Sequence, residues 1–234
     1  MKFLYRVYQL FIAAPVIVIS TIITSLTIAI GASLGSAHFW GYWPGRYWSK
    51  VVCRILLLPV HVEVDPAIRK DKSYVFVANH QGSMDIFLIY GYIGRNFKWM
   101  MKKSLRKMPF IGLACEKARH IFVDKSGPKA IEATYRQARE TLQGGTSLVV
   151  FPEGARTFDG KMIPFRRGAY ALAQEIGLEI VPITIKGCFE VLPRTKGFSF
   201  VEWHPLHLIM HAPIPSNDIN KAMEQSREII EKDL

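Results

Sequence analysis

Apolar and polar positions follow one pattern before about residue 60 and a different one after it. Residues 10–34 form a nearly continuous apolar run, and no Asp, Glu, Lys or Arg lies between Arg6 and Arg46. After residue 60, short runs rich in β-branched and aromatic residues alternate with longer stretches of helical periodicity. The chain is therefore predicted to begin with an apolar helical segment and to continue as a domain in which strands and helices alternate.

The apolar run is long enough to cross a membrane. As a helix, the 25 residues of 10–34 would extend about 37 Å, against a hydrocarbon core of ~30 Å. Cleaved secretory peptides have apolar cores of only about 7–15 residues, which favours a retained segment. Residues 38–60 then mix Trp and Tyr with Arg and Lys, as is typical of a helix at headgroup depth. Two arrangements remain open, a single span or a re-entrant hairpin that turns near residues 35–41.

We assign residues 1–58 to these membrane-associated helices and residues 59–234 to one α/β domain. That domain is predicted to have a mostly parallel sheet flanked by helices. The expected strands are at residues 60–64, 74–78, 120–123, 147–151, 180–185 and 206–211. The expected helices are at residues 85–93, 98–108, 128–143, 167–176 and 218–232, with Gly144 and Gly145 ending the third of them.

Composition narrows the class of protein. Half of the 234 residues are hydrophobic, yet the net charge is +11. Such a chain is neither intrinsically disordered nor collagen-like. The basic excess fits an anionic membrane surface or a phosphorylated ligand at least as well as nucleic acid. The three scattered cysteines, Cys53, Cys115 and Cys188, predict a reducing compartment, and we expect no disulfide scaffold and no metal site.

Two polar clusters follow predicted strands. Residues 79–85 (NHQGSMD) come after the strand at 74–78, and residues 152–157 (PEGART) come after the strand at 147–151. Ligands of open α/β sheets bind at the carboxyl ends of the strands. Two clusters in equivalent positions therefore predict one binding or catalytic site.

The first cluster contains residues suited to general-base catalysis. If the chain folds back, the carboxylate of Asp85 can hold one imidazole nitrogen of His80 and leave the other free to accept a proton. The alternative is that Asp85 only caps the helix at 85–93 while His80 hydrogen-bonds the loop. Ser83 raises the further alternative of a nucleophilic triad, but the chain lacks a G-x-S-x-G elbow, so we expect Ser83 to be a hydrogen-bonding residue of the loop or cap.

The second cluster contains residues suited to anion binding. Gly154 permits a ligand to approach the backbone closely, and the planar guanidinium of Arg156 matches phosphate oxygens. Glu153 would accept hydrogen bonds from a hydroxyl-bearing ligand or orient Arg156. The alternative for Glu153 and Arg156 is a surface ion pair at a turn.

A basic segment lies between the clusters. Residues 95–107 contain six Lys and Arg, no acidic residue and several apolar residues. This composition predicts a basic amphipathic helix that contacts a membrane surface or a phosphate. The alternatives are a solvated basic face and a nucleic-acid patch, although no recognised nucleic-acid-binding module is present.

Together these motifs resemble the glycerolipid acyltransferase family, whose best-known members are the 1-acyl-sn-glycerol-3-phosphate acyltransferases. The resemblance covers roughly residues 60–213. Asn79, His80 and Asp85 match the family's N-H-x4-D motif, and residues 151–157 (FPEGART) match its F-P-E-G-T-R-S motif with Ala in place of Thr. Residues 102–112 are similar to the family's basic segment, and residues 165–168 and 181–183 match further patterns. The second motif normally closes on Arg, where this chain has Lys125, which keeps the charge but loses the bidentate geometry.

The resemblance implies transfer of a fatty acyl group to the free hydroxyl of 1-acyl-sn-glycerol-3-phosphate, which forms phosphatidic acid in phospholipid biosynthesis. The donor would be acyl-CoA or acyl-carrier protein, and no acyl-enzyme would form. His80 would take the hydroxyl proton and Asp85 would support His80. The residues expected to bind substrate are Glu153, Gly154, Arg156, Lys102, Lys103 and Lys125.

We expect no metal and no cofactor. The expected partners are the lysophospholipid acceptor, the acyl donor and an anionic membrane surface, with no nucleic acid. Because the acceptor resides in the bilayer and the donor is soluble, the protein is expected to be membrane-associated with its catalytic domain facing the cytoplasm. The alternatives are the same chemistry on another lyso-acceptor, such as a lyso-amino-acid lipid, a lipid hydrolase, or a non-catalytic phospholipid-binding protein.

Overall fold

The computed structural model describes residues 1–142, 146–197 and 199–234. Within these residues the chain forms a seven-stranded sheet of order β1-β7-β6-β2-β5-β3-β4. Neighbouring strands are parallel except β6 and β7, which are antiparallel. The strands are β1 Val60–Val64, β2 Val75–Ala78, β3 Phe97–Lys102, β4 Ile121–Val123, β5 Ser147–Val150, β6 Ile180–Lys186 and β7 Leu206–Met210. The predicted α/β class with a mostly parallel sheet is confirmed.

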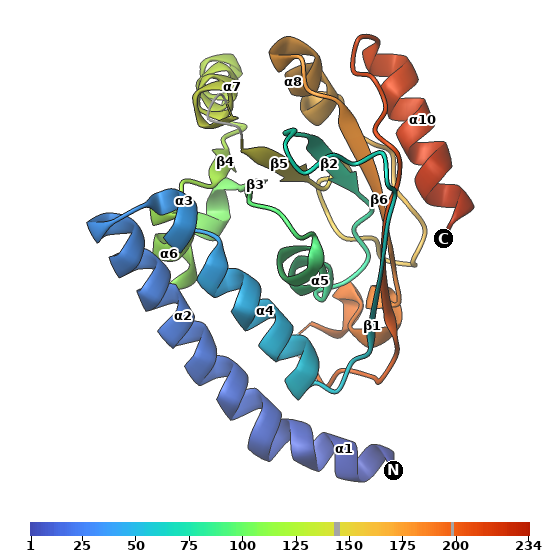
Figure 1. Cartoon of the computed structure of the whole chain (residues 1–234). Helices are drawn as coiled ribbons and strands as arrows, with labels where there is room; N and C mark the ends of the chain where they lie inside the picture. Colours follow the sequence, from blue (N-terminus) through green and yellow to red (C-terminus); the bar gives the residue numbers. More distant parts are fainter. Residues whose placement is uncertain (143–145, 198) are drawn as a thin grey trace.

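Helices cover both faces of the sheet (Figure 1). One face carries α4 (Trp43–Ile55) and α5 (Asp85–Tyr92), and the other carries α7 (Pro128–Leu142), α8 (Gly168–Ile176) and α10 (Ile219–Lys232). Side chains of β2 alternate between the two cores, since Phe76 and Ala78 join the first and Val75 and Val77 join the second. Strands buried on both faces contain continuous apolar runs, which explains why they could be recognised in the sequence.

The N-terminal segment is a helical hairpin. The helices α1 (Lys2–Tyr8) and α2 (Ala14–Leu34) are joined by one π-helical turn, η1 (Gln9–Ala13), just before Pro15, which has no N–H to continue the regular pattern. Together they form a helix long and apolar enough to cross a membrane, with only 17% of its most apolar window buried, which suggests membrane association. After the short α3 (Ala37–Trp40), α4 returns beside α2 in the opposite direction (Figure 1). How the hairpin sits in a membrane stays a prediction.

Hydrogen bonds join the open end of the hairpin to the rest of the chain. The side-chain amide of Gln9, which is buried in η1, donates to the Val201 carbonyl at 2.9 Å and accepts from the Val201 N–H at 2.8 Å. The Tyr5 hydroxyl donates to the carbonyl of Leu56, just after α4, at 2.6 Å. A buried polar side chain needs such partners, so the helix has one preferred position against the domain.

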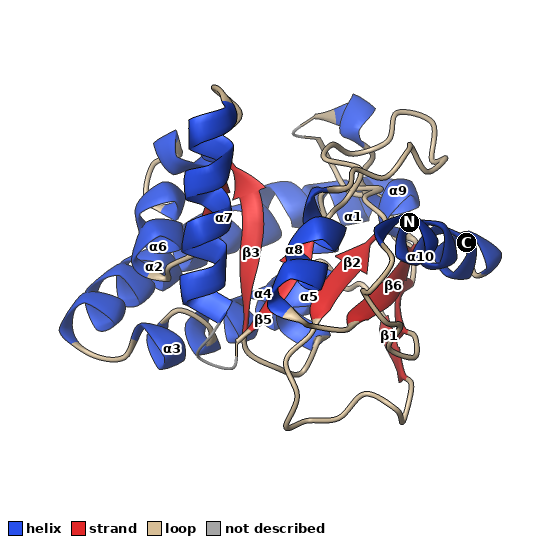
Figure 2. Cartoon of the chain, turned by 90° about the horizontal axis from the view of Figure 1, so that it is seen from above, coloured by secondary structure: helices blue, strands red, loops and turns tan. Residues whose placement is uncertain are grey.

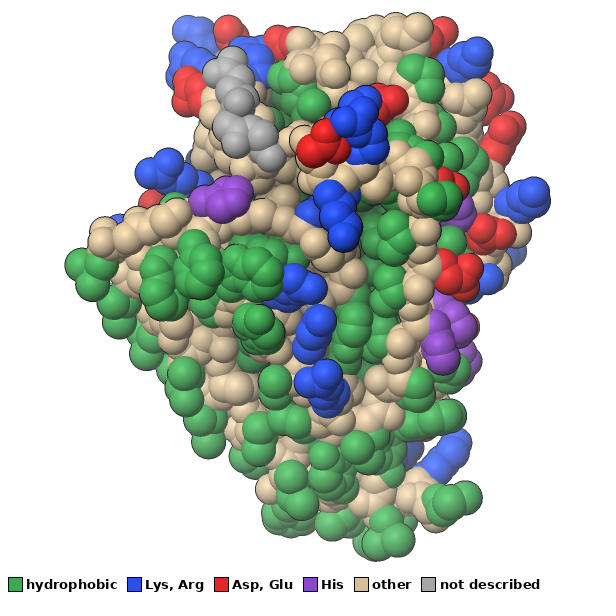
Figure 3. Space-filling model, viewed as in Figure 1, with side chains coloured by type: hydrophobic (Ala, Val, Ile, Leu, Met, Phe, Trp, Pro, Cys, Tyr) green, Lys and Arg blue, Asp and Glu red, His purple; other side chains and the backbone are tan. Residues whose placement is uncertain are grey.

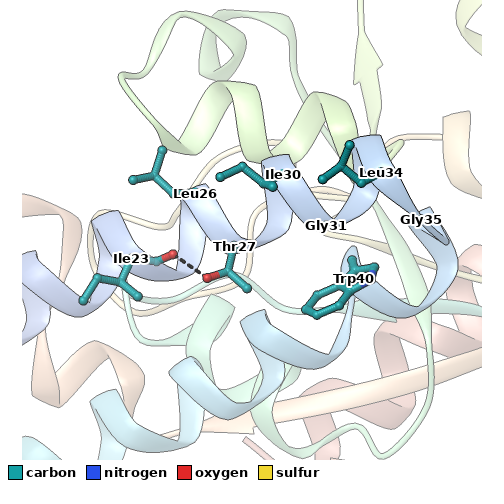
Figure 4. Close-up of a pocket in the computed structure, with 8 residues that line it drawn as sticks. All are labelled: Ile23, Leu26, Thr27, Ile30, Gly31, Leu34, Gly35 and Trp40. Atoms are coloured by element: carbon teal, nitrogen blue, oxygen red, sulfur yellow. Dashed lines mark hydrogen bonds between the residues drawn. The ribbon is translucent and has the colours of Figure 1, made fainter.

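The turn of the hairpin is closed by Trp40. A Cβ atom added to Gly31 would lie 2.4 Å from the Trp40 ring, and one added to Gly35 would lie 3.3 Å from its Nε1 atom. The two glycines therefore let the indole lie directly against α2. Beside this contact, α2 and Trp40 border an apolar hollow of about 570 Å³ (Figure 4). The α2 residues that line it include Ile23, Leu26 and Leu34.

Most predicted elements are present. All six predicted strands are found with ends within one residue, as are the helices predicted at 85–93, 167–176 and 218–232. The helix predicted at 128–143 is described up to Leu142, and the expected stop at Gly144 and Gly145 lies outside the described residues. Asp218 caps α10 by accepting a hydrogen bond from the Lys221 N–H at 3.1 Å.

The helix predicted at residues 98–108 is wrong. Residues Phe97–Lys102 form β3, between β5 and β4, and Lys103–Lys107 form a short 3-10 turn. Lys98 is only 4% exposed and its ammonium donates to the Ala118 carbonyl, just after α6 (Ile111–Lys117), at 2.7 Å. Burial lowers the pKa of Lys98 to about 8. The basic residues have helical spacing, but the aromatic side chains of Phe97 and Trp99 are buried in the sheet, and this tertiary packing determines the local structure.

Candidate active site

The two polar clusters lie against each other. Strands β2 and β5 are parallel neighbours, with Val77 opposite Val150, so both clusters leave the same edge of the sheet. The carbonyl of His80 accepts from the Thr157 N–H at 3.0 Å. Figure 2 shows β2 and β5 side by side beneath the helices. The position expected from the sequence, at the carboxyl ends of the strands, is the one observed.

His80 and Asp85 form a close pair. His80 Nδ1 lies 2.6 Å from Asp85 Oδ2, and the carboxylate is fully buried at the first residue of α5. The same oxygen accepts from the N–H groups of Gln81 at 2.7 Å and Gly82 at 3.0 Å. Asp85 thus binds the imidazole and the preceding loop at once. The His80 side chain is 15% exposed, and Nε2 is the ring nitrogen left to accept a proton.

An aromatic stack fixes the plane of the imidazole. The ring of Phe151 lies parallel to His80, with centroids 3.9 Å apart and planes at 9°. Trp99 stacks on Phe151, with centroids 5.5 Å apart. Sequence reasoning missed both residues as parts of the site. Phe151 directly precedes the second cluster and could have been found, whereas Trp99 was placed in a helix that does not exist.

Glu153 joins the two clusters and does not lie at the surface. It is 1% exposed, and its carboxylate accepts from the N–H groups of His80 at 2.6 Å and Ile163 at 2.9 Å. Burial raises the pKa of Glu153, and the two hydrogen bonds oppose that rise. The surface ion pair considered for Glu153 is therefore wrong, because the side chain is buried and bonded to the main chain. Direct binding of a substrate hydroxyl by Glu153 stays a prediction.

Arg156 and Ser83 contact each other. The guanidinium of Arg156 donates through Nη1 to the hydroxyl oxygen of Ser83. This bond connects the second cluster to the first and holds the arginine beside the loop that carries His80. It also gives Ser83 a cationic partner, which is the opposite of what a serine nucleophile needs, since such a serine must pass its proton to a base.

Three cations, Lys102, Lys125 and Arg166, lie near one another, and Arg166 contacts Gly154. Gly154 has φ +72°, and a Cβ atom there would lie 3.0 Å from Arg166 Nε. Desolvation, followed by the charges of Arg166 and Lys102, lowers the pKa of Lys125. No ion pair links these three cations to a carboxylate in the parts of the chain that are described. Lys103 differs, because its ammonium lies 2.6 Å from Asp124 Oδ2.

The cation cluster refines the expected set of binding residues. Lys102 and Lys125 lie near Arg166, which contacts Gly154, whereas the charge of Lys103 is balanced by Asp124. Substrate binding by these residues stays a prediction. Arg166, which lies in the 165–168 pattern, was not among the residues expected to bind substrate. Across residues 1–142, 146–197 and 199–234, no group of three His, Cys, Asp or Glu side chains is placed to hold a metal ion. An imidazole held by a carboxylate can take a proton from a hydroxyl, and neighbouring cations can bind an anion such as a phosphate.

A comparison with protein-family models matches residues 59–186 to the family described as Acyltransferase. This chain belongs to the acyltransferase family. The matched region holds both polar clusters, β3 and the basic turn, so the resemblance found from the motifs is confirmed.

Named relatives of this acyltransferase point to one group within the family. It is 33% identical over 147 residues to a 1-acyl-sn-glycerol-3-phosphate acyltransferase of Chlamydomonas reinhardtii, covering 63% of this chain and 44% of that one. It is 29% identical over 160 residues to a chloroplastic enzyme of the same name from Arabidopsis thaliana, covering 68% and 44%. The chain thus spans about half the length of the curated relatives it matches.

A solved structure matches almost the whole acyltransferase. The crystal structure of the 1-acyl-sn-glycerophosphate acyltransferase PlsC from Thermotoga maritima superposes with a TM-score of 0.80 at 25% identity. The match covers 98% of this chain and 93% of that one, so it includes the N-terminal hairpin as well as the sheet.

Proposed function

We propose that this acyltransferase moves a fatty acyl group from a thioester donor to the free hydroxyl of 1-acyl-sn-glycerol-3-phosphate and forms phosphatidic acid. The observation that carries the proposal is that the His80–Asp85 pair lies at the same end of the sheet as Arg166, which contacts Gly154. Arg166, Lys102 and Lys125 form a group of cations without a carboxylate partner among the described residues. A base and an anion site at the carboxyl ends of neighbouring strands match an acceptor that carries both a hydroxyl and a phosphate. The names of the relatives support the same acceptor.

The chemistry follows from the position of the imidazole. His80 Nε2 removes the proton as the acceptor oxygen attacks the thioester carbonyl carbon, and Asp85 stabilises the imidazolium that forms. The tetrahedral intermediate then collapses, the C–S bond breaks, and the leaving thiolate takes the proton from His80. The transfer is direct, so atoms and charge balance without an acyl-enzyme.

The acceptor would be bound by Arg156 of the second cluster and by basic residues outside the two clusters. Lys102, Lys125 and Arg166 would hold the phosphate, and the missing side chain of Gly154 lets the Arg166 guanidinium lie against the second cluster. Arg156, fixed by Ser83, would contact the phosphate or glycerol. The apolar hairpin would keep the protein at the membrane, where the acceptor resides. The donor would be acyl-CoA or acyl-carrier protein.

Replacing Arg156 with alanine is expected to raise the acceptor KM by roughly 10- to 100-fold, because a charge-assisted hydrogen bond to phosphate contributes about 1.5–3 kcal/mol. The measurement is steady-state transfer at varied acceptor concentration, with the same substitution at Arg136, an exposed residue of α7, as control. An unchanged KM and kcat for Arg156→Ala would remove this residue from the acceptor site.

Replacing Ser83 with alanine is expected to leave kcat within about tenfold of the parent, with a modest rise in acceptor KM, because Ser83 binds Arg156. If Ser83 were the nucleophile of a hydrolase, Ser83→Ala would lose all turnover. The parent protein would then yield a covalent acyl-enzyme on rapid quenching. Mass spectrometry of the quenched protein distinguishes these cases. Detection of an acyl group on Ser83 would replace the proposed mechanism with the hydrolase.

The acceptor itself is tested by a panel of substrates. Lys125 stands where the family has Arg, so a different lyso-acceptor is a specific second candidate. Purified protein in detergent is given 1-acyl-sn-glycerol-3-phosphate, neutral lysolipids and lyso-amino-acid lipids, each with acyl-CoA and with acyl-carrier protein, and the products are read by mass spectrometry. We expect the phosphate monoester to be acylated at least about tenfold faster than the others, on the strength of its charged contacts.

A further inference from the structure

Strand β1 is an open edge of the sheet. It is first in the strand order, and among the described residues it pairs with β7 alone. The side chains from His61 to Val64 are exposed, with Val62 at 39% and Val64 at 53%. Natural edge strands are commonly protected by charged residues, Pro or a bulge. In VHVEV the one acidic or basic side chain apart from His61 is Glu63, and Pro59 and Pro66 lie outside the strand. The edge is therefore free to pair with another strand.

The residues whose main-chain groups point outward can be identified. The Pro59 carbonyl accepts from the Leu206 N–H at 2.8 Å, and the Asp65 N–H donates to the Met210 carbonyl at 2.9 Å. In a parallel ladder, alternate residues direct both N–H and C=O to the same neighbour. The odd-numbered residues thus bond to β7, and Val60, Val62 and Val64 direct their main-chain groups away from the sheet.

The sequence of β1 is complementary to itself in the antiparallel direction. We propose that β1 pairs with β1 of a second copy of this chain about a two-fold axis at Val62. In this register, Val62 lies opposite Val62 of the second copy, and Val60 lies opposite its Val64. The residues with outward-pointing groups then bond only to one another. His61 lies opposite Glu63 of the second copy, in the non-hydrogen-bonded positions where side chains approach most closely.

Charge complementarity favours a second copy over an unrelated strand. The pairing places each His61 opposite a Glu63 carboxylate, so that one complementary pair forms twice by symmetry. His61 also stacks on His207 of its own chain, with ring centroids 4.8 Å apart, which holds the imidazole in place. Figure 3 shows histidine and acidic side chains together along the margin of the molecule where Figure 1 places β1.

The dimer is compatible with one membrane. The two-fold axis of an antiparallel strand pair is perpendicular to the sheet, so both copies keep the same face of the continuous sheet on the same side. The hairpin lies on the face that carries α4 and α5, where Val60 contacts the core. Both hairpins would then face a single bilayer. Because one strand pair is a small interface, the dimer is expected to be concentration-dependent and to be favoured by confinement in the membrane.

The first test removes the central main-chain bond. In the full-length protein, Val62→Pro deletes an outward N–H while the odd-numbered residues keep their bonds to β7. We expect the parent chain to show a concentration-dependent dimer in detergent by light scattering and in vesicles by energy transfer between labelled copies. Val62→Pro should be monomeric, with turnover and unfolding midpoint near those of the parent. A parent that is monomeric at every concentration and in vesicles, or a dimer unaffected by Val62→Pro, would overturn the proposal.

The second test exchanges the charges. His61→Glu places two carboxylates opposite one another, and Glu63→Lys replaces the acceptor for His61 with an ammonium that cannot accept a hydrogen bond. Each should raise the dimer dissociation constant at least about fivefold. The double variant restores opposite charges and should return it to within about twofold of the parent, which loss of folding could not do. In a Cys115→Ser background, Val62→Cys should crosslink between copies, and the equally exposed Ile131→Cys (41%) should not. Crosslinking of Val62→Cys only to other proteins, or failure of the double variant to restore pairing, would exclude self-pairing.

Discussion

Replacing His80 with alanine is expected to reduce kcat by about 10³-fold, within the range of roughly 10²–10⁴ that a positioned general base contributes. The imidazole is held by Asp85 at 2.6 Å and stacked on Phe151, so Nε2 has a fixed direction. Without it the acceptor hydroxyl must lose its proton to water. The acceptor KM should change little, because the proposed phosphate contacts belong to other residues.

The measurement is initial transfer rate at saturating donor and acceptor. His80→Gln keeps a polar side chain of similar size that cannot act as a base, so it should be as inactive as His80→Ala. His38→Ala, on α3 in the hairpin, controls for loss of an exposed histidine. Vesicle binding and the far-ultraviolet circular dichroism of the His80 variants should match the parent. Turnover of either His80 variant within threefold of the parent is incompatible with the proposed mechanism and would leave a phospholipid-binding protein as the better description.

Strands were predictable here where burial on both faces forces a continuous apolar run. Strand β2 and the apolar part of β6 are of this kind, and their neighbours in the chain are clear turns. Strand β3 was not predictable, because Lys98 and Lys102 have helical spacing and the burial of Lys98 depends on α6 supplying the Ala118 carbonyl. This local structure depends on a contact between segments twenty residues apart. The periodicity of the sequence gives no information about that contact.

The same distinction applies to the site. The closeness of His80 to Asp85 follows from a short loop between a strand end and a helix start, so it could be inferred from spacing. The placement of Arg166 beside Gly154, and of Lys103 beside Asp124, depends on how separate loops face one another across the sheet edge. Charge in the sequence showed that cations were available, but only the fold distinguishes Lys103, which is paired, from Lys102 and Lys125.

Replacing Asp85 with asparagine is expected to lower kcat by about 10²- to 10⁴-fold, since the loss of the carboxylate in an acid–histidine pair costs up to ~10⁴. The amide oxygen can still accept from His80 and from the N–H groups of Gln81 and Gly82, so the loop should keep its shape. What disappears is the negative charge that stabilises the imidazolium in the transition state. The effect should therefore fall on kcat and leave the acceptor KM nearly unchanged.

The matched control for this substitution is Asp218→Asn. Asp218 also stands at the start of a helix and accepts a main-chain hydrogen bond, from Lys221, and asparagine caps a helix about as well as aspartate. Both variants should keep an unfolding midpoint near the parent's, and only Asp85→Asn should lose turnover. If Asp85→Asn instead keeps turnover within threefold, its carboxylate serves the loop and helix α5 alone, because an amide satisfies those hydrogen bonds but cannot supply charge to His80. Kinetics and thermal unfolding measured on the two variants thus separate a capping residue from one that positions and stabilises the base.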